Sequence, residues 1–253
     1  EVGSNHVLTA AVDVEPLANF ILSTSGSLNG ISFEALENNS TVSYTANSGT
    51  QIVKPATYSN LTLSGNGLKN AGGHITVNGT LHIGDNPNNE RGQLEMTISY
   101  ADYADVHDVN STSIYNDLNS YVLTMGPNAI TTGTGDVTGK IRRTTIASGT
   151  TYTFGNINTQ LTFNNSGGGD LPTEITVVAT FGEQGLHVEK ADAEKRMYQV
   201  LRTGGTNPTR MIIRLAYLDN ELNSNTESSL VLWDHHLPYG GITPHEHGKT
   251  NQS

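Results

Sequence analysis

Hydrophobic and polar residues alternate in short runs along much of the chain, and between residues 41 and 84 these runs return about every ten residues. An alternation of period two is typical of strands that bury one face. Gly, Asn and Ser separate the runs and supply the positive φ angles that tight turns require. The pattern therefore predicts an all-β protein. The apolar positions that carry it are Ile31, Phe33, Val42, Tyr44, Ile52, Val53, Leu61, Leu63, Ile75, Val77, Leu81 and Ile83.

Two architectures share this spacing, the coils of a parallel β-solenoid and the strands of an antiparallel sandwich, and periodicity alone does not separate them. For residues 29–135 we favour the solenoid-like arrangement. Residues 100–119 depart from the pattern and predict a long acidic loop that leads into a strand at 120–125. Long loops of this kind are either binding elements or plain insertions. The acidic residues of the loop are Asp102, Asp105, Asp108 and Asp117.

A second β-rich part follows a Thr-Gly-Thr-Gly segment at 132–135. Seven short apolar runs between residues 136 and 233 match the strand content of a β-sandwich. We therefore predict a solenoid-like or sandwich N-terminal body followed by a C-terminal β-sandwich, with the boundary near 133–136. Residues 234–253 form a polar, His-rich tail.

The N-terminal segment, residues 1–28, is apolar and is interrupted by Pro16, which predicts two short strands hinged at Glu15-Pro16. Such strands either close their own domain or add to an open sheet edge of a neighbouring subunit. The residues that would carry assembly in the second case are Val7, Leu8, Val12, Val14, Leu17, Phe20, Ile21 and Leu22.

Residues 40–84 read STVSYTANSGTQIVKPATYSNLTLSGNGLKNAGGHITVNGTLHIG, a wording that resembles repeats in very large secreted, adhesin-like cell-surface proteins of Bacteroidetes-type bacteria. The second half, with GDVTGKIRRT at 135–144 and YLDNELNSNTESSLVLW at 217–233, resembles a domain that follows such repeats. The resemblance implies secretion, a β-rich extracellular fold and membership in an adhesin or surface assembly. It transfers no catalytic residues.

Composition removes several classes of function. With 13 Lys and Arg against 24 Asp and Glu, the formal charge is -11, which argues against nucleic acid and anionic membrane surfaces as partners. There is no cysteine and hence neither a disulfide nor a thiolate metal site. No apolar run approaches the roughly 18 residues of a membrane span, so we expect no membrane insertion.

Two segments contain residue types that bind metals. The stretch 219–227 is dense in oxygen donors, which suits calcium, but it lacks the order of an EF-hand and also fits an Asx-rich turn. Histidines near the C-terminus could share a transition metal or lie in a polar tail. The candidate ligands are Asp219, Glu221, Asn223, Asn225, His235, His245 and His247.

Aromatic side chains suggest a further alternative, a platform for glycans, although tyrosines in β proteins are commonly half-buried strand residues. No spacing selects a pair of acids for glycoside hydrolysis, and GxSxG is absent. We therefore expect a protein that is not an enzyme. The aromatic residues in question are Tyr100, Tyr103, Tyr115, Tyr121 and Trp233.

These observations predict an extracellular or cell-surface structural and adhesive protein. The sharper hypothesis is a filament subunit whose partners are other copies of itself, joined by N-terminal strand addition. The alternative is a carbohydrate-binding or calcium-dependent adhesion module, cut from a larger protein, that recognises glycans or a host surface. No cofactor other than calcium is expected.

Overall fold

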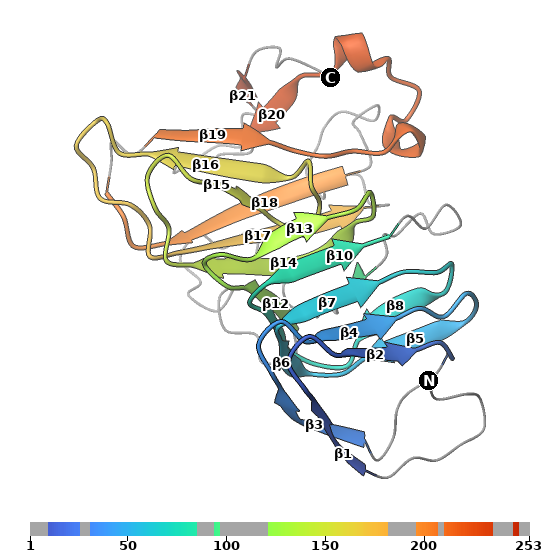
Figure 1. The fold of residues 1–253 in the computed structure, drawn as a ribbon. Helices are drawn as coiled ribbons and strands as arrows, with labels where there is room; N and C mark the ends of the chain where they lie inside the picture. Colours follow the sequence, from blue (N-terminus) through green and yellow to red (C-terminus); the bar gives the residue numbers. More distant parts are fainter. Residues whose placement is uncertain are drawn as a thin grey trace. The chain divides into compact units, whose positions relative to one another are not determined.

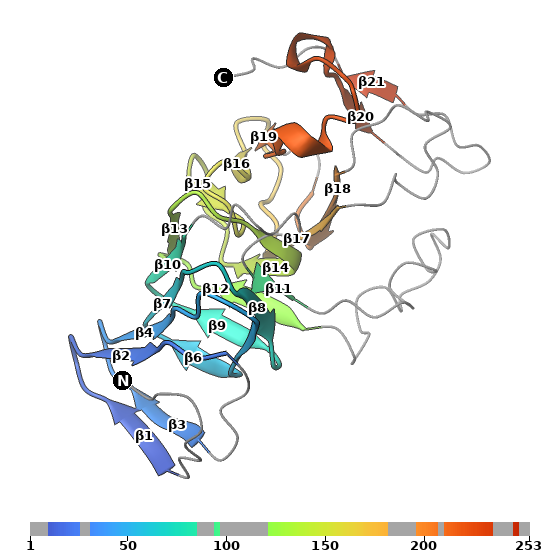
Figure 2. The same cartoon turned by 90° about the vertical axis from the view of Figure 1, so that its right-hand side faces the viewer.

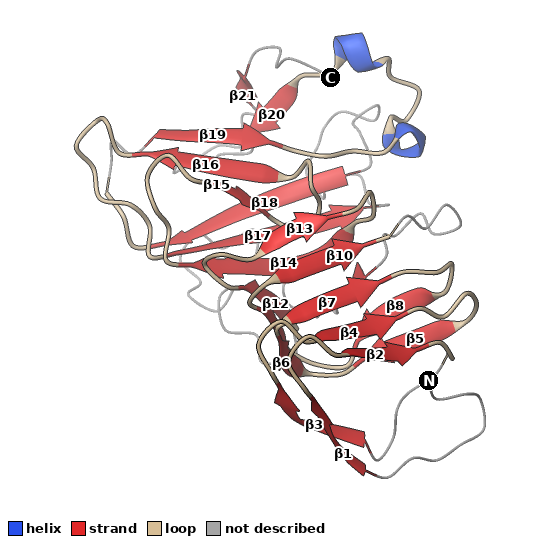
Figure 3. Ribbon diagram, in the orientation of Figure 1, coloured by secondary structure: helices blue, strands red, loops and turns tan. Residues whose placement is uncertain are grey.

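The computed structural model describes residues 10–25, 31–84, 94–96, 121–181, 196–206, 210–234 and 245–247. The chain divides into two compact units, described separately below. Regular structure in the described residues is almost entirely β, with two short 3-10 turns and no α-helix (Figure 3). The all-β prediction is thus confirmed. Unit 1 comprises Glu1–Ile98, Leu118–Ala179 and Tyr198–Ala216, and unit 2 comprises Ser99–Asp117, Thr180–Met197 and Tyr217–Ser253.

Unit 1 contains a parallel β-solenoid in which each coil gives one strand to each of three parallel sheets (Figure 1). The first full coil consists of β4 (Thr41–Tyr44), β5 (Thr50–Val53) and β6 (Ala56–Tyr58). The second consists of β7 (Asn60–Leu63), β8 (Leu68–Ala71) and β9 (Ile75–Val77). The third consists of β10 (Thr80–Ile83), β11 (Leu94–Glu95) and β12 (Val122–Met125).

The coils stack in register because equivalent residues recur at nearly constant intervals. Leu61 pairs with Val42 nineteen residues earlier and with Leu81 twenty residues later. Inward-facing side chains consequently form columns along the solenoid, and those of β4, β7 and β10 in the first sheet are fully buried. The solenoid-like arrangement is therefore the one present. The first sheet, called sheet 1 below, has the order β13-β10-β7-β4-β2.

The N-terminal strands are part of this solenoid. Strand β1 (Ala10–Val14) pairs in parallel with β3 (Ile31–Leu36), and β2 (Asn19–Leu22) pairs in parallel with β4. The turn between β1 and β2 contains Pro16, which lacks the N–H that a continuous strand would need. The two strands hinged at this proline are therefore consecutive sides of the first coil.

The other end of the solenoid changes from parallel to antiparallel pairing. Strand β14 pairs in parallel with β11 of one sheet and with β12 of another, and so joins these two sheets. It also pairs antiparallel with β17, which in turn pairs with β18. Strands β15, β16 and β19 form a separate antiparallel sheet whose buried Leu161 and Phe163 belong to the same hydrophobic core. These strands are β13 (Ile130–Thr132), β14 (Val137–Thr144), β15 (Thr151–Thr153), β16 (Gln160–Asn164), β17 (Glu174–Phe181), β18 (Arg196–Thr203) and β19 (Arg210–Arg214).

The boundary expected near residues 133–136 lies between β13 and β14, inside unit 1. Each of the seven runs predicted after residue 135 contains a strand, from β14 to β20. The C-terminal β-sandwich itself stays a prediction.

Unit 2 contains the short turns η3 (Asp219–Glu221) and η4 (Glu227–Ser229), followed by β20 (Leu232–Asp234). Strand β20 pairs antiparallel with β21 (His245–His247). Within the described part of the chain, no helix has the length and apolarity needed to cross a membrane.

Candidate functional site

The solenoid interior holds a lysine where an apolar residue would be expected. Lys69 is fully buried, and its Nζ donates hydrogen bonds to the carbonyl oxygens of Ala46 at 3.1 Å and Gly67 at 2.7 Å. These carbonyls belong to the turns of two successive coils, so the ammonium group ties the turns together. Burial lowers the pKa of Lys69 from 10.5 to about 8.

A buried arginine, Arg143, lies on β14 at the C-terminal end of the solenoid. The guanidinium of Arg143, 1% exposed, donates to the carbonyl oxygens of Gly126 at 3.0 Å, Ala129 at 2.8 Å and Thr153 at 2.8 Å. It lies over the ring of Tyr152, 5.3 Å from the centroid. The side chain therefore links the last turn of the solenoid to strand β15, and this end is closed by packed side chains and the antiparallel strands.

The N-terminal end differs, because among the residues that the structure describes no further strand follows the outermost strands of the sheets. Strand β2 is the last strand of sheet 1 and β1 the last strand of its pair, so in the described residues each has one edge without a strand partner. Leu17, 81% exposed, and Ile21, 40% exposed, lie on this first coil. Unpaired parallel edges with apolar side chains beside them are a template for further strands.

Leu17 is unusual in conformation as well as in exposure. Its φ angle is +63°, in the left-handed region that a leucine adopts only at a cost of about 1 kcal/mol. Asn39 occupies the corresponding turn of the next coil with nearly the same angle, +64°, and asparagine tolerates this conformation. The chain thus carries an exposed, strained leucine where its own next coil carries a suitable polar residue.

The structure separates the predicted assembly residues by environment. Val14 and Leu22 are buried in the core of the chain's own solenoid, and Val12 and Phe20 are partly buried against it. Leu17 and Ile21 are the exposed members of the set. Val7 and Leu8 lie outside the described residues.

Charge is distributed unevenly over unit 1. The chain has no Lys or Arg before Lys54, and Asp13, Glu15 and Glu37 near the open end are exposed. Residues 198–216, by contrast, contain three arginines and no acid. Two of them, Arg210 and Arg214, are exposed at the two ends of β19 and enclose Met211, 38% exposed, and Ile212, 69% exposed.

The outer face of sheet 1 is polar but uncharged. Figure 2 shows its strands β2, β4, β7, β10 and β13 stacked along one side of the solenoid. His82 contacts the Thr132 hydroxyl at 3.0 Å, and the Ser43 hydroxyl donates to Asn19 at 2.9 Å. The face therefore carries rows of hydroxyl groups about 4.8 Å apart across the strands, although Ser43 is only 4% exposed and the Asn60 amide is bonded to the backbone of Ser40 and Thr80. Its residues are Asn19, Ile21, Thr41, Ser43, Asn60, Thr62, Thr80, His82, Ile130 and Thr132.

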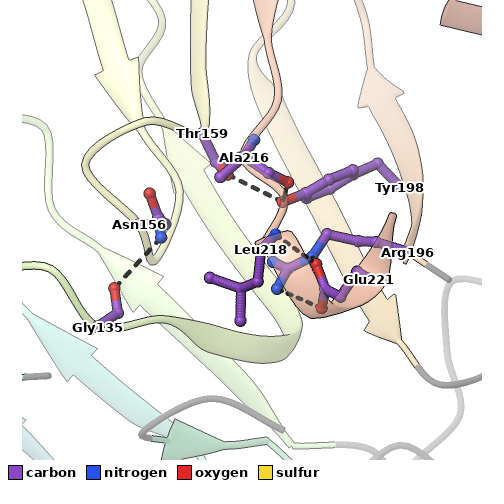
Figure 4. Close-up of polar contacts among 8 residues, drawn as sticks. All are labelled: Gly135, Asn156, Thr159, Arg196, Tyr198, Ala216, Leu218 and Glu221. Carbon is purple, nitrogen blue, oxygen red and sulfur yellow. Dashed lines mark hydrogen bonds and ion pairs between the residues drawn. The ribbon is translucent and has the colours of Figure 1, made fainter. Parts of the chain in front are cut away.

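In unit 2, the predicted calcium segment is organised around an ion pair. The Arg196 guanidinium donates to both carboxylate oxygens of Glu221 at 2.8 Å, and the Leu218 amide donates to the same carboxylate at 2.8 Å (Figure 4). Asp219 is exposed. Glu221 is therefore occupied by internal donors, which leaves less of its oxygen capacity for a cation.

The other candidate ligands are spread along the chain. Asn223 and Asn225 are half-buried, and the Asn225 amide donates to the Leu222 carbonyl oxygen at 2.8 Å. His245 and His247 lie on β21, where their side chains are not described, and His235 falls outside the described residues. Among the residues that are described, no group of three or more His, Asp or Glu is arranged to hold a metal.

The predicted glycan aromatics can be followed only in part. Tyr121 is half-buried, and its ring packs edge-on against His74 with centroids 6.1 Å apart. Trp233 lies on β20, but its side chain is not described. The prediction for Tyr100, Tyr103 and Tyr115 lies outside the described residues, as does the whole acidic loop at 100–119.

Sequence reasoning missed Lys69, Arg143 and the pair of arginines on β19. A signal for the last was present in the string RMIIR at 210–214, where two cations enclose an apolar run on a short strand. The buried cations gave no such signal, because their carbonyl partners come from turns up to 23 residues away.

The fold defines an all-β, β-solenoid-like protein, in which the described residues leave the N-terminal end of the solenoid open and pack antiparallel strands at the other. No family model, no curated protein and no solved structure matches the chain.

Proposed function

We propose that this chain is an extracellular structural and adhesive surface protein whose copies join end to end through the open end of the solenoid. The observation that carries the proposal is the first coil, where, in the described part of the chain, β1 and β2 end their sheets beside the exposed Leu17 and Ile21. The acidic composition, the absence of cysteine and the resemblance to secreted surface proteins support the location.

An open solenoid end favours assembly because its edge strands carry backbone N–H and C=O groups without strand partners. Proteins usually blunt such edges with charges, bulges or covering segments. The first coil carries the exposed charges of Asp13 and Glu15, but between them and β2 it also exposes Leu17. The N-terminal strands thus lie at the proposed subunit interface. They form the edge that receives the next copy and are not donated to it, because Val14 and Leu22 are buried in the core of their own solenoid.

Electron microscopy of the purified protein over a range of concentrations tests this proposal, with Leu17→Asn as the diagnostic variant. Asparagine suits the φ angle of +63°, so the variant should be at least as stable as the wild type while losing assembly. The matched control is Ile157→Asn, which removes another apolar side chain of unit 1, 41% exposed, and should leave fibres intact. Wild-type particles that stay single at every concentration would refute the proposal.

A second candidate function, binding of a neutral glycan, is favoured by the outer face of sheet 1. Ten outward positions without one charge are unusual in a protein with a formal charge of -11. Regularly spaced hydroxyls and amides suit the hydroxyls of an uncharged polysaccharide chain. We expect Thr62→Glu to weaken co-sedimentation with insoluble neutral polysaccharides, and Thr162→Glu on β16 to leave it unchanged. Equal retention of both variants would argue against this candidate.

A further inference from the structure

We propose that the open solenoid end of one copy binds the β19 surface of the next copy, with acidic residues of the first facing Arg210 and Arg214 of the second. This inference rests on the end-to-end assembly proposed above and adds the identity of the second surface. Both surfaces belong to unit 1.

The β19 surface is defined by strand register. Strand β19 pairs antiparallel with β16, and Arg210, Ile212 and Arg214 lie opposite Asn164, Thr162 and Gln160 respectively. Directly opposed residues share a face, whereas the alternate residue Ile213 packs against the buried core. The outward face of β19 thus presents an isoleucine that is 69% exposed between two arginines.

This strand is also the last one of its sheet in the described part of the chain, where the order is β15-β16-β19. Exposed apolar area, an edge without a strand partner and two cations therefore occur together on five consecutive residues. The open end has the same first two properties, with Ile21 and Leu17 as the apolar residues. The two surfaces differ in the sign of their charge.

Opposite charge makes the two surfaces complementary. Asp13, Glu15 and Glu37 are exposed around the open end, which has no cation within the first 53 residues. Pairing of β19 with β19 of a second copy in antiparallel register would instead place Arg210 against Arg214, and like charges directly opposite are destabilising. The arginines thus oppose a symmetric contact and favour an acidic partner.

A contact between two different surfaces does not close on itself as a symmetric dimer does, so it repeats from copy to copy. The resulting filament has a direction, with an acidic end and a basic end. Its assembly should weaken with salt, because the screening length falls from about 10 Å at 0.1 M to about 3 Å at 1 M.

The test measures the critical concentration for assembly by light scattering and electron microscopy for charge-reversed full-length chains. Arg210→Glu with Arg214→Glu, and separately Glu15→Arg with Glu37→Arg, should each raise this concentration at least tenfold. An equimolar mixture of the two variants should recover assembly, because each then meets a partner of opposite charge. The control Arg202→Glu reverses one exposed arginine of β18, outside β19, and should have little effect, whereas Arg210→Glu or Arg214→Glu alone should raise the critical concentration.

The outcomes separate this inference from the proposal on which it rests. Assembly that is lost in Leu17→Asn but kept when both β19 arginines are reversed would overturn the β19 assignment and leave the open end in place. Failure of the mixture to recover would also overturn it, provided that circular dichroism shows both variants to be folded. Milder Arg→Gln changes at the same positions should give a smaller loss in the same direction. Wild-type protein that never assembles would overturn both proposals.

Discussion

Lys69 offers a direct test of how the solenoid interior is stabilised. Its ammonium group is fully buried and donates hydrogen bonds to backbone carbonyl oxygens, and burial lowers its pKa from 10.5 to about 8. One unit of pKa corresponds to about 1.4 kcal/mol. Charging this lysine in the folded protein therefore costs about 3 kcal/mol more than charging it in the unfolded chain.

The pH dependence follows from the direction of this change. Between pH 8 and 10.5 the folded lysine has lost its proton while the unfolded one still holds it, so the unfolded state binds more protons and stability rises with pH. Below pH 8 both states are charged, and the cost is constant. The neutral amine still has two N–H groups for the carbonyls of Ala46 and Gly67.

We therefore expect the unfolding free energy of the wild type, relative to Lys69→Met, to increase by about 3 kcal/mol between pH 7 and 10.5. Urea unfolding at 25 °C, followed by circular dichroism, measures this difference, in which the titration of other groups cancels. Gln51→Met is the matched control, because Gln51 is buried beside Lys69 in the same column and does not titrate. A difference that stays flat or falls with pH would refute the reasoning.

Three further changes test other parts of the fold. Arg143→Met should lower the unfolding free energy by about 3 kcal/mol, since three carbonyl oxygens lose a buried donor; a loss below about 1 kcal/mol in urea unfolding would contradict this role. Glu221→Gln should speed hydrogen exchange at 218–229 and leave unit 1 unchanged, because Arg196 loses its carboxylate; unchanged exchange would show that the pair does not hold the segment. Gly133→Ala should lower Tm well below that of Gly149→Ala, because a Cβ at Gly133 would lie 2.0 Å from the Ile83 oxygen whereas Gly149 has nothing within 4 Å; equal melting temperatures would exclude that clash.

Much of the strand content could be predicted because local alternation decides it. The runs at 41–83 form strands whose apolar residues point into the core, with the exception of Ile52. Ile52 is half-buried, and its two neighbours on the strand, Gln51 and Val53, are buried instead. The inward position is Gln51, whose amide donates to the Leu22 carbonyl at 2.9 Å and the Thr24 carbonyl at 3.0 Å. Hydrogen bonds to the previous coil thus place Gln51 inside and Ile52 outside, the reverse of what hydrophobicity alone predicts.

Pairing could not be predicted in the same way, because it depends on contacts between distant residues. Strand β19 pairs with β16, about fifty residues earlier, and β14 joins two parallel sheets before an antiparallel partner. For the candidate site, Leu17 and Ile21 were among the predicted assembly residues, but only the fold distinguishes these exposed side chains from the buried Val14 and Leu22. The basic surface emerges only once β19 is known to end its sheet.

Because the coils stack through paired strands, the number of residues in one coil can vary while the strand pairing between coils stays the same. Leu61 and Leu81 pair at an interval of twenty residues, whereas Thr80 and Ile130 pair at an interval of fifty, and both are ordinary steps of the same parallel ladder. Most of this difference lies at one corner: the chain advances 28 residues from Glu95 to Leu123, where the previous coil advances five from Asn70 to Ile75, and the next coil still pairs in register. A foreign peptide inserted at this corner would be displayed from a scaffold that already accommodates a long guest there.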